Sequence, residues 1–424
     1  MRPPVALALL LAQLLHVAGR PNPLIVVPGL GGSVLEAKLT DAPEFRDCQT
    51  TSSDWYTIFF SISQVVERFK CWEERFALTM APDGDSHVVQ SAPGVEIRPR
   101  DFGGVDGIEY SNSGSGDWIP MPYMKVMVEK LEQDAGLVRN TSLRAATYDF
   151  RKAGDWASTV AQFEALQGLV EETYEINEQL PVHLLSHSLG GAFTTAFLNL
   201  QVSEEWKEKY VASFINLSGP LLGTPITMAA LLTGPVYDYV PQILPELLVP
   251  VLRTAPSMVW MSPQDSDVFP SDLPILTTNT ANYSAKDLGA FLDDLDAPLM
   301  SAVWTDGGVE KLRAASSMSP GVPHFCAYAN DTETGLTYQY AVDNLADAGS
   351  GKMLEVTMGD GTVTLGSLER CLSEEGGWAG DLVEHKVYAW GGGMDAHTGI
   401  VKYDPLLDDL VAYLNRTDVW RTQA

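Results

Sequence analysis

Short apolar runs alternate along the chain with longer segments that have helical spacing. Leu24 to Val27 are four apolar residues in a row, which predict a buried strand. Asp155 to Asn177 predicts an amphipathic helix, with Trp156, Val160, Phe163, Leu166, Val170 and Tyr174 on one stripe. Further strands are predicted at 181–187, 212–217, 325–328 and 386–390. Strands that alternate with helices predict an α/β fold with a mostly parallel sheet and helices on both faces.

The alternation of predicted strands and helices stops between Gly223 and about Pro320, where prolines recur among apolar residues. We interpret this segment as a cap inserted over the site; the alternative is an irregular part of the main core. The predicted organisation is a signal peptide (1–19), a first core part (20–222) with an insertion at about 45–75, the cap (223–320) and a second core part (321–424).

The N-terminus has the pattern of a secretory signal. Arg2 precedes an apolar run from Val5 to Leu15, and small residues at 17–19 suit a signal peptidase. The run is too short for a permanent span of a bilayer. The alternative is an uncleaved anchor. We therefore place the protein in the secretory pathway.

The chain of 424 residues is 45% hydrophobic, an ordinary globular composition that allows one large domain with insertions or two domains. Its formal net charge of −28 argues against binding nucleic acid and against electrostatic docking on anionic membranes. We interpret the charge mainly as a source of solubility.

Four cysteines in a secreted chain predict two disulfides. Three pairings are possible. We favour Cys48–Cys71 and Cys326–Cys371, because each closes a loop inside one region.

Glycosylation motifs fit the same compartment. The candidates are Asn140, Asn282, Asn330 and Asn415. Asn216 also matches the motif, but it lies in a segment that predicts a buried strand end, so we interpret it as a chance match.

The loop between Cys48 and Cys71 contains the aromatic and apolar run Asp54 to Phe60. So much apolar surface in a disulfide-closed loop predicts a lid or a patch that binds a lipid interface. The alternative is that these side chains pack inward.

Ser188 follows a predicted strand directly and precedes a segment compatible with a helix. Its surroundings, Ser186-His187-Ser188-Leu189-Gly190, are typical of a nucleophile elbow, in which a sharp turn projects the serine hydroxyl above a sheet. The first glycine of the usual motif is replaced by Ser186, which is still small.

A serine nucleophile needs a histidine base and a carboxylate to orient that base, and in this fold they follow the serine in the order acid, then histidine. His397 comes after the glycine-rich loop that follows the strand predicted at 386–390, on the same sheet edge as Ser188. His385 would begin that strand and lie at the opposite edge. Asp360, between two glycines, is the candidate acid; the alternative is a turn aspartate with only local hydrogen bonds.

Two backbone N–H groups must bind the oxyanion. We predict those of Leu189, directly after the nucleophile, and of Leu30, in the glycine-rich loop after the first strand. No Cys/His cluster with metal-ligand spacing and no phosphate-binding loop is present, so we predict neither a metal nor a cofactor.

Several of these motifs together resemble the lecithin:cholesterol acyltransferase family. The segment Val27 to Leu39, the run Thr147 to Arg151 and the segments around Ser188, Asp360 and His397 are similar to the family in order and sequence. The early disulfide loop with a tryptophan, here Trp55, and the late disulfide also fit.

The resemblance implies an α/β-hydrolase core with a cap domain and a membrane-binding region. It implies that an acyl chain leaves a phospholipid for Ser188 and passes to water or to a lipid alcohol. The expected partner is a phospholipid membrane or lipoprotein surface, and the expected compartment is extracellular or a lysosomal or vacuolar lumen. Leu30 departs from the family, because the lysosomal member has an acidic residue there and the plasma member a cysteine.

The function predicted from the sequence is therefore that of a phospholipase A or O-acyltransferase with a serine nucleophile. Two alternatives stay open at this point. One is a lipase or esterase for neutral lipids, and the other is a lipid-binding protein on a hydrolase scaffold.

Overall fold

The structure is a computed structural model, and it describes residues 21–59, 61–82, 87–112, 120–234, 245–349, 351–391 and 396–416. The predicted signal peptide lies outside these residues. Within the described ranges, no helix combines the length and the apolar character needed to cross a bilayer.

A six-stranded sheet forms the centre of the molecule, with the strand order β15-β12-β9-β8-β1-β7. Every neighbouring pair in it is parallel. Its strands are β1 (Leu24–Val27), β7 (Leu143–Ala145), β8 (Val182–His187), β9 (Val211–Leu217), β12 (His324–Ala329) and β15 (Leu382–Tyr388). The predicted parallel sheet is thus confirmed.

The last strand differs from its prediction. We predicted 386–390, whereas β15 spans Leu382–Tyr388, so His385 lies inside the strand rather than before it. There its Nε2 lies 3.1 Å from the hydroxyl of Tyr328 on the neighbouring strand. Alternating exposed and half-buried side chains on this edge strand replace the apolar run that marks the inner strands.

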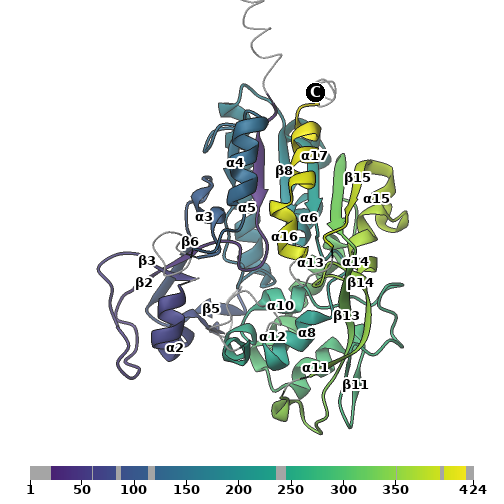
Figure 1. Cartoon of the computed structure of the whole chain (residues 1–424). Helices are drawn as coiled ribbons and strands as arrows, with labels where there is room; N and C mark the ends of the chain where they lie inside the picture. The colour runs from purple at the N-terminus through teal and green to yellow at the C-terminus, as the bar shows by residue number, and fades with distance from the viewer. Residues whose placement is uncertain are drawn as a thin grey trace, which may run out of the picture.

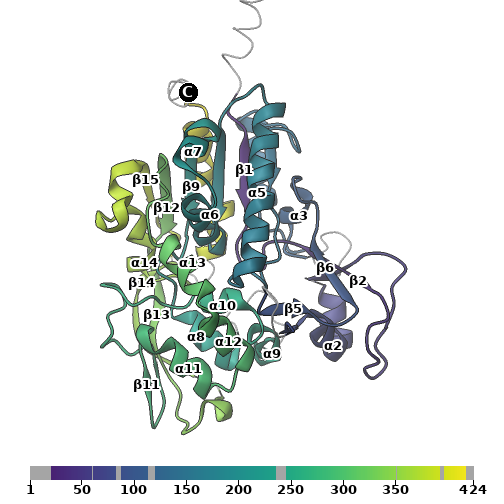
Figure 2. The same cartoon turned by 180° about the vertical axis from the view of Figure 1, so that it is seen from behind.

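Helices cover both faces of the sheet. Figure 1 shows α4 (Lys125–Asp134) and α17 (Asp404–Leu414) over one face, and Figure 2 shows α5 (Trp156–Ile176), α6 (Leu189–Leu200) and α7 (Glu204–Tyr210) over the other. Side chains alternate accordingly along β1: Leu24 and Val26 join the core with α4 and α17, while Ile25 and Val27 join the core with α5 and α6. The helix predicted from Asp155 to Asn177 is confirmed, with these two residues as its caps.

Most of the segment between β9 and β12 lies beyond the carboxyl edge of the sheet (Figure 1). Its helices are α8 (Ile226–Thr233), α9 (Val249–Leu252), α10 (Pro256–Trp260), α11 (Leu288–Asp294), α12 (Pro298–Asp306) and α13 (Gly308–Ser316). A second sheet lies there, with β11 (Asn282–Tyr283), β10 (Leu276–Thr277), β13 (Thr332–Gln339) and β14 (Lys352–Gly359) in that order. This sheet joins strands from both sides of residue 320, so the cap-like region combines two stretches of chain.

The early insertion packs against the side of the core. A three-stranded sheet of β2 (Leu35–Leu39), β3 (Tyr56–Phe59) and β6 (Val95–Pro99) lies beside helix α2 (Ile62–Phe76). Disulfide Cys48–Cys71 closes its loop, and Cys326–Cys371 ties β12 to the turn after α14 (Leu365–Leu368). The structure therefore contains both of the favoured pairings.

Aromatic side chains of this insertion are divided between two environments. Phe59 packs inward, with its ring centroid 5.2 Å from that of Phe76 and 4.8 Å from that of Phe150. Trp55 is half-buried. The guanidinium carbon of Arg98 lies over the Trp55 ring, 4.0 Å from the ring centroid. The inward packing that we kept as the alternative is thus found for Phe59.

Candidate active site

Ser188 occupies the turn between β8 and α6 in an uncommon backbone conformation. Its φ and ψ are 56° and −129°, a region that non-glycine residues rarely adopt and that surrounding structure must enforce. Close packing enforces it here: a Cβ added to Gly190 would lie 2.4 Å from the carbonyl oxygen of Val27. This conformation is that of a nucleophile elbow.

His397 and Asp360 come together with Ser188 from distant parts of the chain. His397 Nε2 lies 2.8 Å from Ser188 Oγ, and its Nδ1 lies 2.7 Å from Asp360 Oδ2. Asp360 follows β14, and His397 lies in α16 (Ala396–Gly399). The backbone N–H of His397 also donates to the carbonyl of Asp360 at 3.0 Å, so the two residues are joined by side chain and by backbone.

Asp360 is fully buried, and each of its carboxylate oxygens has a donor. Oδ1 accepts from the N–H groups of Thr362 and Val363 at 3.0 and 2.7 Å, which leaves Oδ2 for the imidazole. Because a carboxylate only accepts hydrogen bonds, Nδ1 of His397 donates and Nε2 is left as the acceptor for the serine hydroxyl. The arrangement can therefore deprotonate Ser188.

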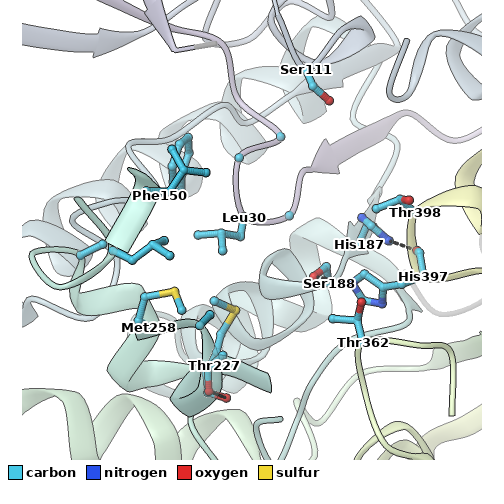
Figure 3. A pocket seen from close by; sticks show the side chains of 18 of the residues that line it. Leu30, Ser111, Phe150, His187, Ser188, Thr227, Met258, Thr362, His397 and Thr398 are labelled. Atoms are coloured by element: carbon cyan, nitrogen blue, oxygen red, sulfur yellow. Dashed lines mark hydrogen bonds between the residues drawn. The ribbon is translucent and has the colours of Figure 1, made fainter. Parts of the chain in front are cut away.

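The glycine-rich loop after β1 lies directly against the serine. A Cβ added to Gly29 would lie 2.8 Å from Ser188 Cβ, so only glycine allows this approach. Leu30 follows in the turn, with its side chain toward the cavity (Figure 3). Leu189 is the first residue of α6, where the N–H has no partner within the helix. Both predicted oxyanion donors thus belong to segments that adjoin Ser188.

A cavity of about 460 Å³ opens beside Ser188 and His397. Figure 3 shows Leu30, Phe150, Met258 and Thr227 around the cavity on one side of Ser188, with His187, His397 and Thr398 on the other. Its apolar wall comes from the early insertion, the core and the cap: Phe59, Trp72, Phe76, Phe150, Ile226, Leu248, Val251, Leu252, Met258 and Met261. Such a wall suits a long hydrocarbon chain rather than a polar substrate.

His187 has partners that the sequence analysis does not predict, because nothing in the serine motif distinguishes this position. Its Nδ1 lies 2.6 Å from the hydroxyl of Tyr123, and its Nε2 lies 2.8 Å from the carbonyl oxygen of His397. Burial lowers the pKa of His187 to about 3, so this imidazole is neutral. Its partners are 64 and 210 residues away, and no local pattern indicates such contacts.

The remaining predicted residues lie away from the cavity. Trp55 lines a separate hollow beside the Cys48–Cys71 disulfide. Of the glycosylation candidates, Asn140, Asn282 and Asn415 are exposed and Asn330 is half-buried. Asn216 is 1% exposed on β9, an environment closed to a glycan. Among the described residues, Asp47 lies beside Cys48 and Cys71, but the disulfide between these sulfurs removes them as thiolate ligands.

Comparison with known proteins places the chain in a family. The family model described as lecithin:cholesterol acyltransferase matches residues 55–305, which is more than half of the chain. The chain belongs to the lecithin:cholesterol acyltransferase family. The resemblance stated from the motifs is thereby confirmed.

Relatives and a solved structure match most of the chain. It is 32% identical over 368 residues to lecithin-cholesterol acyltransferase-like 1 of Arabidopsis thaliana, covering 82% of this chain and 81% of that protein. It is 31% identical to the lysosomal phospholipase A and acyltransferase of Canis lupus familiaris, over 89% of this chain and 88% of the relative. The crystal structure of the Tle4-Tli4 complex matches with a TM-score of 0.50 at 12% identity, covering 95% of this chain and 99% of that one. The last match concerns the fold alone.

Proposed function

We propose that this member of the lecithin:cholesterol acyltransferase family removes a fatty acyl group from a phospholipid and passes it to a lipid alcohol or to water. The observation that carries the proposal is the hydrogen-bonded series Ser188–His397–Asp360 at the wall of an apolar cavity. The family match supports a phospholipid donor, as does the name of the canine relative, a phospholipase A and acyltransferase.

In the first half of the reaction, Ser188 Oγ attacks the ester carbonyl while His397 Nε2 takes the hydroxyl proton. Asp360 holds the imidazole in the tautomer that accepts this proton and stabilises the imidazolium that forms. The N–H groups of Leu30 and Leu189 bind the oxyanion of the tetrahedral intermediate. His397 then gives the proton to the leaving oxygen, so a lysophospholipid departs and the acyl chain stays on Ser188.

The second half reverses these proton transfers. His397 takes a proton from the incoming water or lipid hydroxyl, whose oxygen attacks the acyl-serine, and returns it to Ser188 Oγ as the new acyl product leaves. Water and alcohol compete for the same intermediate, so the ratio of fatty acid to new ester depends on how well the cavity excludes water.

Access to the site is expected to be interfacial. Trp55 and the disulfide-closed loop Cys48–Cys71 are the proposed contact with a phospholipid membrane or a lipoprotein surface. Given the net charge of −28, this contact would depend on apolar and aromatic side chains rather than on attraction to anionic lipids. A secreted or lysosomal protein is consistent with such a role and with the two disulfides.

The test is an incubation of the purified protein with phosphatidylcholine vesicles, with and without a sterol or another lipid alcohol, followed by identification of the acyl products. We expect lysophospholipid together with fatty acid, and a new lipid ester when an acceptor is present. Fatty acid as the sole product under all conditions would remove the transferase half, and turnover of triacylglycerol emulsions alone would favour a neutral-lipid lipase.

Substitutions can distinguish the loss of a triad residue from a loss of activity caused by damage to the fold. Ser188→Ala is expected to lower turnover on the order of a million-fold, by analogy with other serine triads. His397→Gln removes the base, and His385→Gln, inside β15, serves as its control and should keep wild-type activity. Substantial turnover by Ser188→Ala would contradict the proposed mechanism.

A further inference from the structure

A buried chain of hydrogen bonds runs from the loop after β1 to the backbone of His397. The N–H of Gly29 donates to the hydroxyl oxygen of Tyr123 at 3.1 Å. That hydroxyl lies 2.6 Å from Nδ1 of His187, and Nε2 of His187 lies 2.8 Å from the carbonyl oxygen of His397. The last of these bonds is the dashed line of Figure 3. Tyr123 and His187 are only 6% and 2% exposed.

The direction of every bond in this chain follows from the chemistry of its groups. The carbonyl of His397 can only accept, so Nε2 of His187 carries the hydrogen. A neutral imidazole has one N–H, which makes Nδ1 an acceptor and the hydroxyl of Tyr123 its donor. The oxygen of Tyr123 is then free to accept from Gly29. One arrangement of protons satisfies all the groups.

Burial keeps both side chains in the protonation states that this arrangement needs. It lowers the pKa of His187 to about 3, with the neighbouring imidazole of His397 as a second cause; the hydrogen bond to the carbonyl of His397 and then the charge of Asp360 act in the opposite sense. Burial raises the pKa of Tyr123, so its hydroxyl keeps its proton. The two side chains therefore keep the donor and acceptor atoms that these hydrogen bonds require.

This series of hydrogen bonds ends at two parts of the site, the oxyanion loop and the base, which must both act at the substrate carbonyl. Gly29 precedes Leu30, whose N–H is the proposed oxyanion donor. The backbone of His397 is held on both sides, because its N–H donates to Asp360 and its carbonyl accepts from His187. His187 also precedes Ser188 directly, so one residue connects the strand of the nucleophile to the backbone of the base.

We propose that Tyr123 and His187 are positioning residues, which fix the oxyanion loop and His397 relative to Ser188. Both residues also line the cavity, and the inference, which rests on the proposed function, assigns their role to these hydrogen bonds rather than to contact with substrate. A displacement of about 1 Å at such a site costs on the order of 100-fold in rate. Loss of these hydrogen bonds should therefore lower kcat and leave KM nearly unchanged.

Two substitutions of His187 separate its two hydrogen bonds. In His187→Gln the amide nitrogen can take the place of Nε2 and keep the donor to His397. In His187→Asn the shorter amide reaches only the place of Nδ1, so it keeps an acceptor for Tyr123 and loses the bond to His397. We expect kcat to fall about 30- to 100-fold for Asn and much less for Gln.

Tyr123→Phe removes only a hydroxyl and takes the partner away from both Gly29 and His187. We expect it to lower kcat by about tenfold or more, and to add little to the effect of His187→Asn, because both changes interrupt the same chain. This variant keeps the ring and its packing, so it remains informative if substitutions of His187 impair folding.

The readout is turnover of phosphatidylcholine per reactive site, with sites counted by labelling with a fluorophosphonate, so that unfolded protein does not contribute. The matched control is His183→Gln. His183 lies on the same strand, is fully buried and bonds to Ser213 Oγ at 2.8 Å outside the site. It should lose stability but keep kcat per labelled site and KM.

Equal kcat per labelled site for His187→Asn, Tyr123→Phe and His183→Gln would overturn the inference. A wild-type protein that is labelled but does not turn over phospholipid would contradict the proposed function instead. In that case the rates of phosphonylation of the same variants test the positioning role. If the wild-type protein is not labelled by the fluorophosphonate, both the proposed function and the positioning role are contradicted.

Discussion

At the scale of single residues, the site depends on a carboxylate both of whose oxygens accept hydrogen bonds. Asp360 accepts from Thr362 and Val363 with one oxygen and from His397 with the other. An amide of the same shape can accept on one side only. Whichever way it is turned, it either opposes two backbone N–H groups or opposes the N–H of His397 and favours the wrong tautomer.

Asp360→Asn is therefore expected to lower kcat by about 10⁴-fold with little change in KM, as in other serine triads. Steady-state kinetics on phosphatidylcholine vesicles measure both constants, and labelling by a fluorophosphonate should slow in parallel. A loss of less than about tenfold would show that Asp360 is only a turn aspartate with local hydrogen bonds, the alternative left open from the sequence.

The residues that sequence analysis could propose are those with a local signal. Ser188 stands in a motif, Asp360 lies between two glycines and His397 follows a glycine-rich loop, in the chain order that this fold uses. The structure brings the three residues within hydrogen-bond distance of one another in series. Their catalytic roles stay predictions. Tyr123 and His187 have no such signal, because their importance comes from contacts between segments far apart in the chain.

At the scale of elements, the elbow is kept sharp by the packing of α6 against β1. At Gly190 the two backbones approach so closely that there is no space for a Cβ beside the carbonyl of Val27. Since backbone on both sides would have to move, a methyl group cannot be accommodated there by a change of rotamer.

We expect Gly190→Ala to destabilise the protein by about 1–3 kcal/mol, the range for overpacking, and to lower activity per labelled site by displacing Ser188. The matched control is Gly168→Ala in α5, where an added Cβ meets nothing within 4 Å; it should stabilise by about 0.4–1 kcal/mol. Urea unfolding followed by circular dichroism measures both. Equal effects of the two substitutions would contradict the role of Gly190.

Strands and helices of the core could be predicted because their apolar residues form continuous runs or recur with helical spacing. β1, β9 and α5 were located from apolar runs and from one helical stripe. β15 was placed several residues too late, since an edge strand with one exposed face lacks a continuous apolar run. β13 pairs with β10 from before residue 320, a long-range pairing that no local pattern reveals.

At the scale of the whole molecule, the cavity is made by segments that are separate in the sequence. The loop after β1, helix α2 and the helices of the cap region each contribute part of its apolar wall. Sequence analysis proposed an insertion over the site but could not predict its shape, because proline-rich apolar segments have no period that fixes how they pack. The acyl chains that fit are thus determined by tertiary packing.

The buried histidines also make the whole fold sensitive to acid. Burial lowers the pKa of His183 to about 3 from 6.5, so between these values the unfolded chain binds a proton that the folded protein excludes. Stability then rises with pH across this window and is lost as pH falls through it, by about 1.4 kcal/mol per pH unit for one such group. At pH values above the window, His183 is neutral in both states and adds no pH dependence.

His183→Gln removes this titration and keeps a polar side chain beside Ser213. As pH is lowered from about 6 to about 4, we expect the unfolding free energy of wild type to fall more steeply than that of the variant. The difference between the two slopes should be about 1.4 kcal/mol per pH unit. Urea denaturation at a series of pH values gives both curves, and the titration of carboxylates is common to the two proteins and cancels in the difference. Parallel curves would mean that His183 can become protonated without unfolding. Diverging curves would show that burial of His183 makes the unfolding free energy of wild type more dependent on pH than that of the variant.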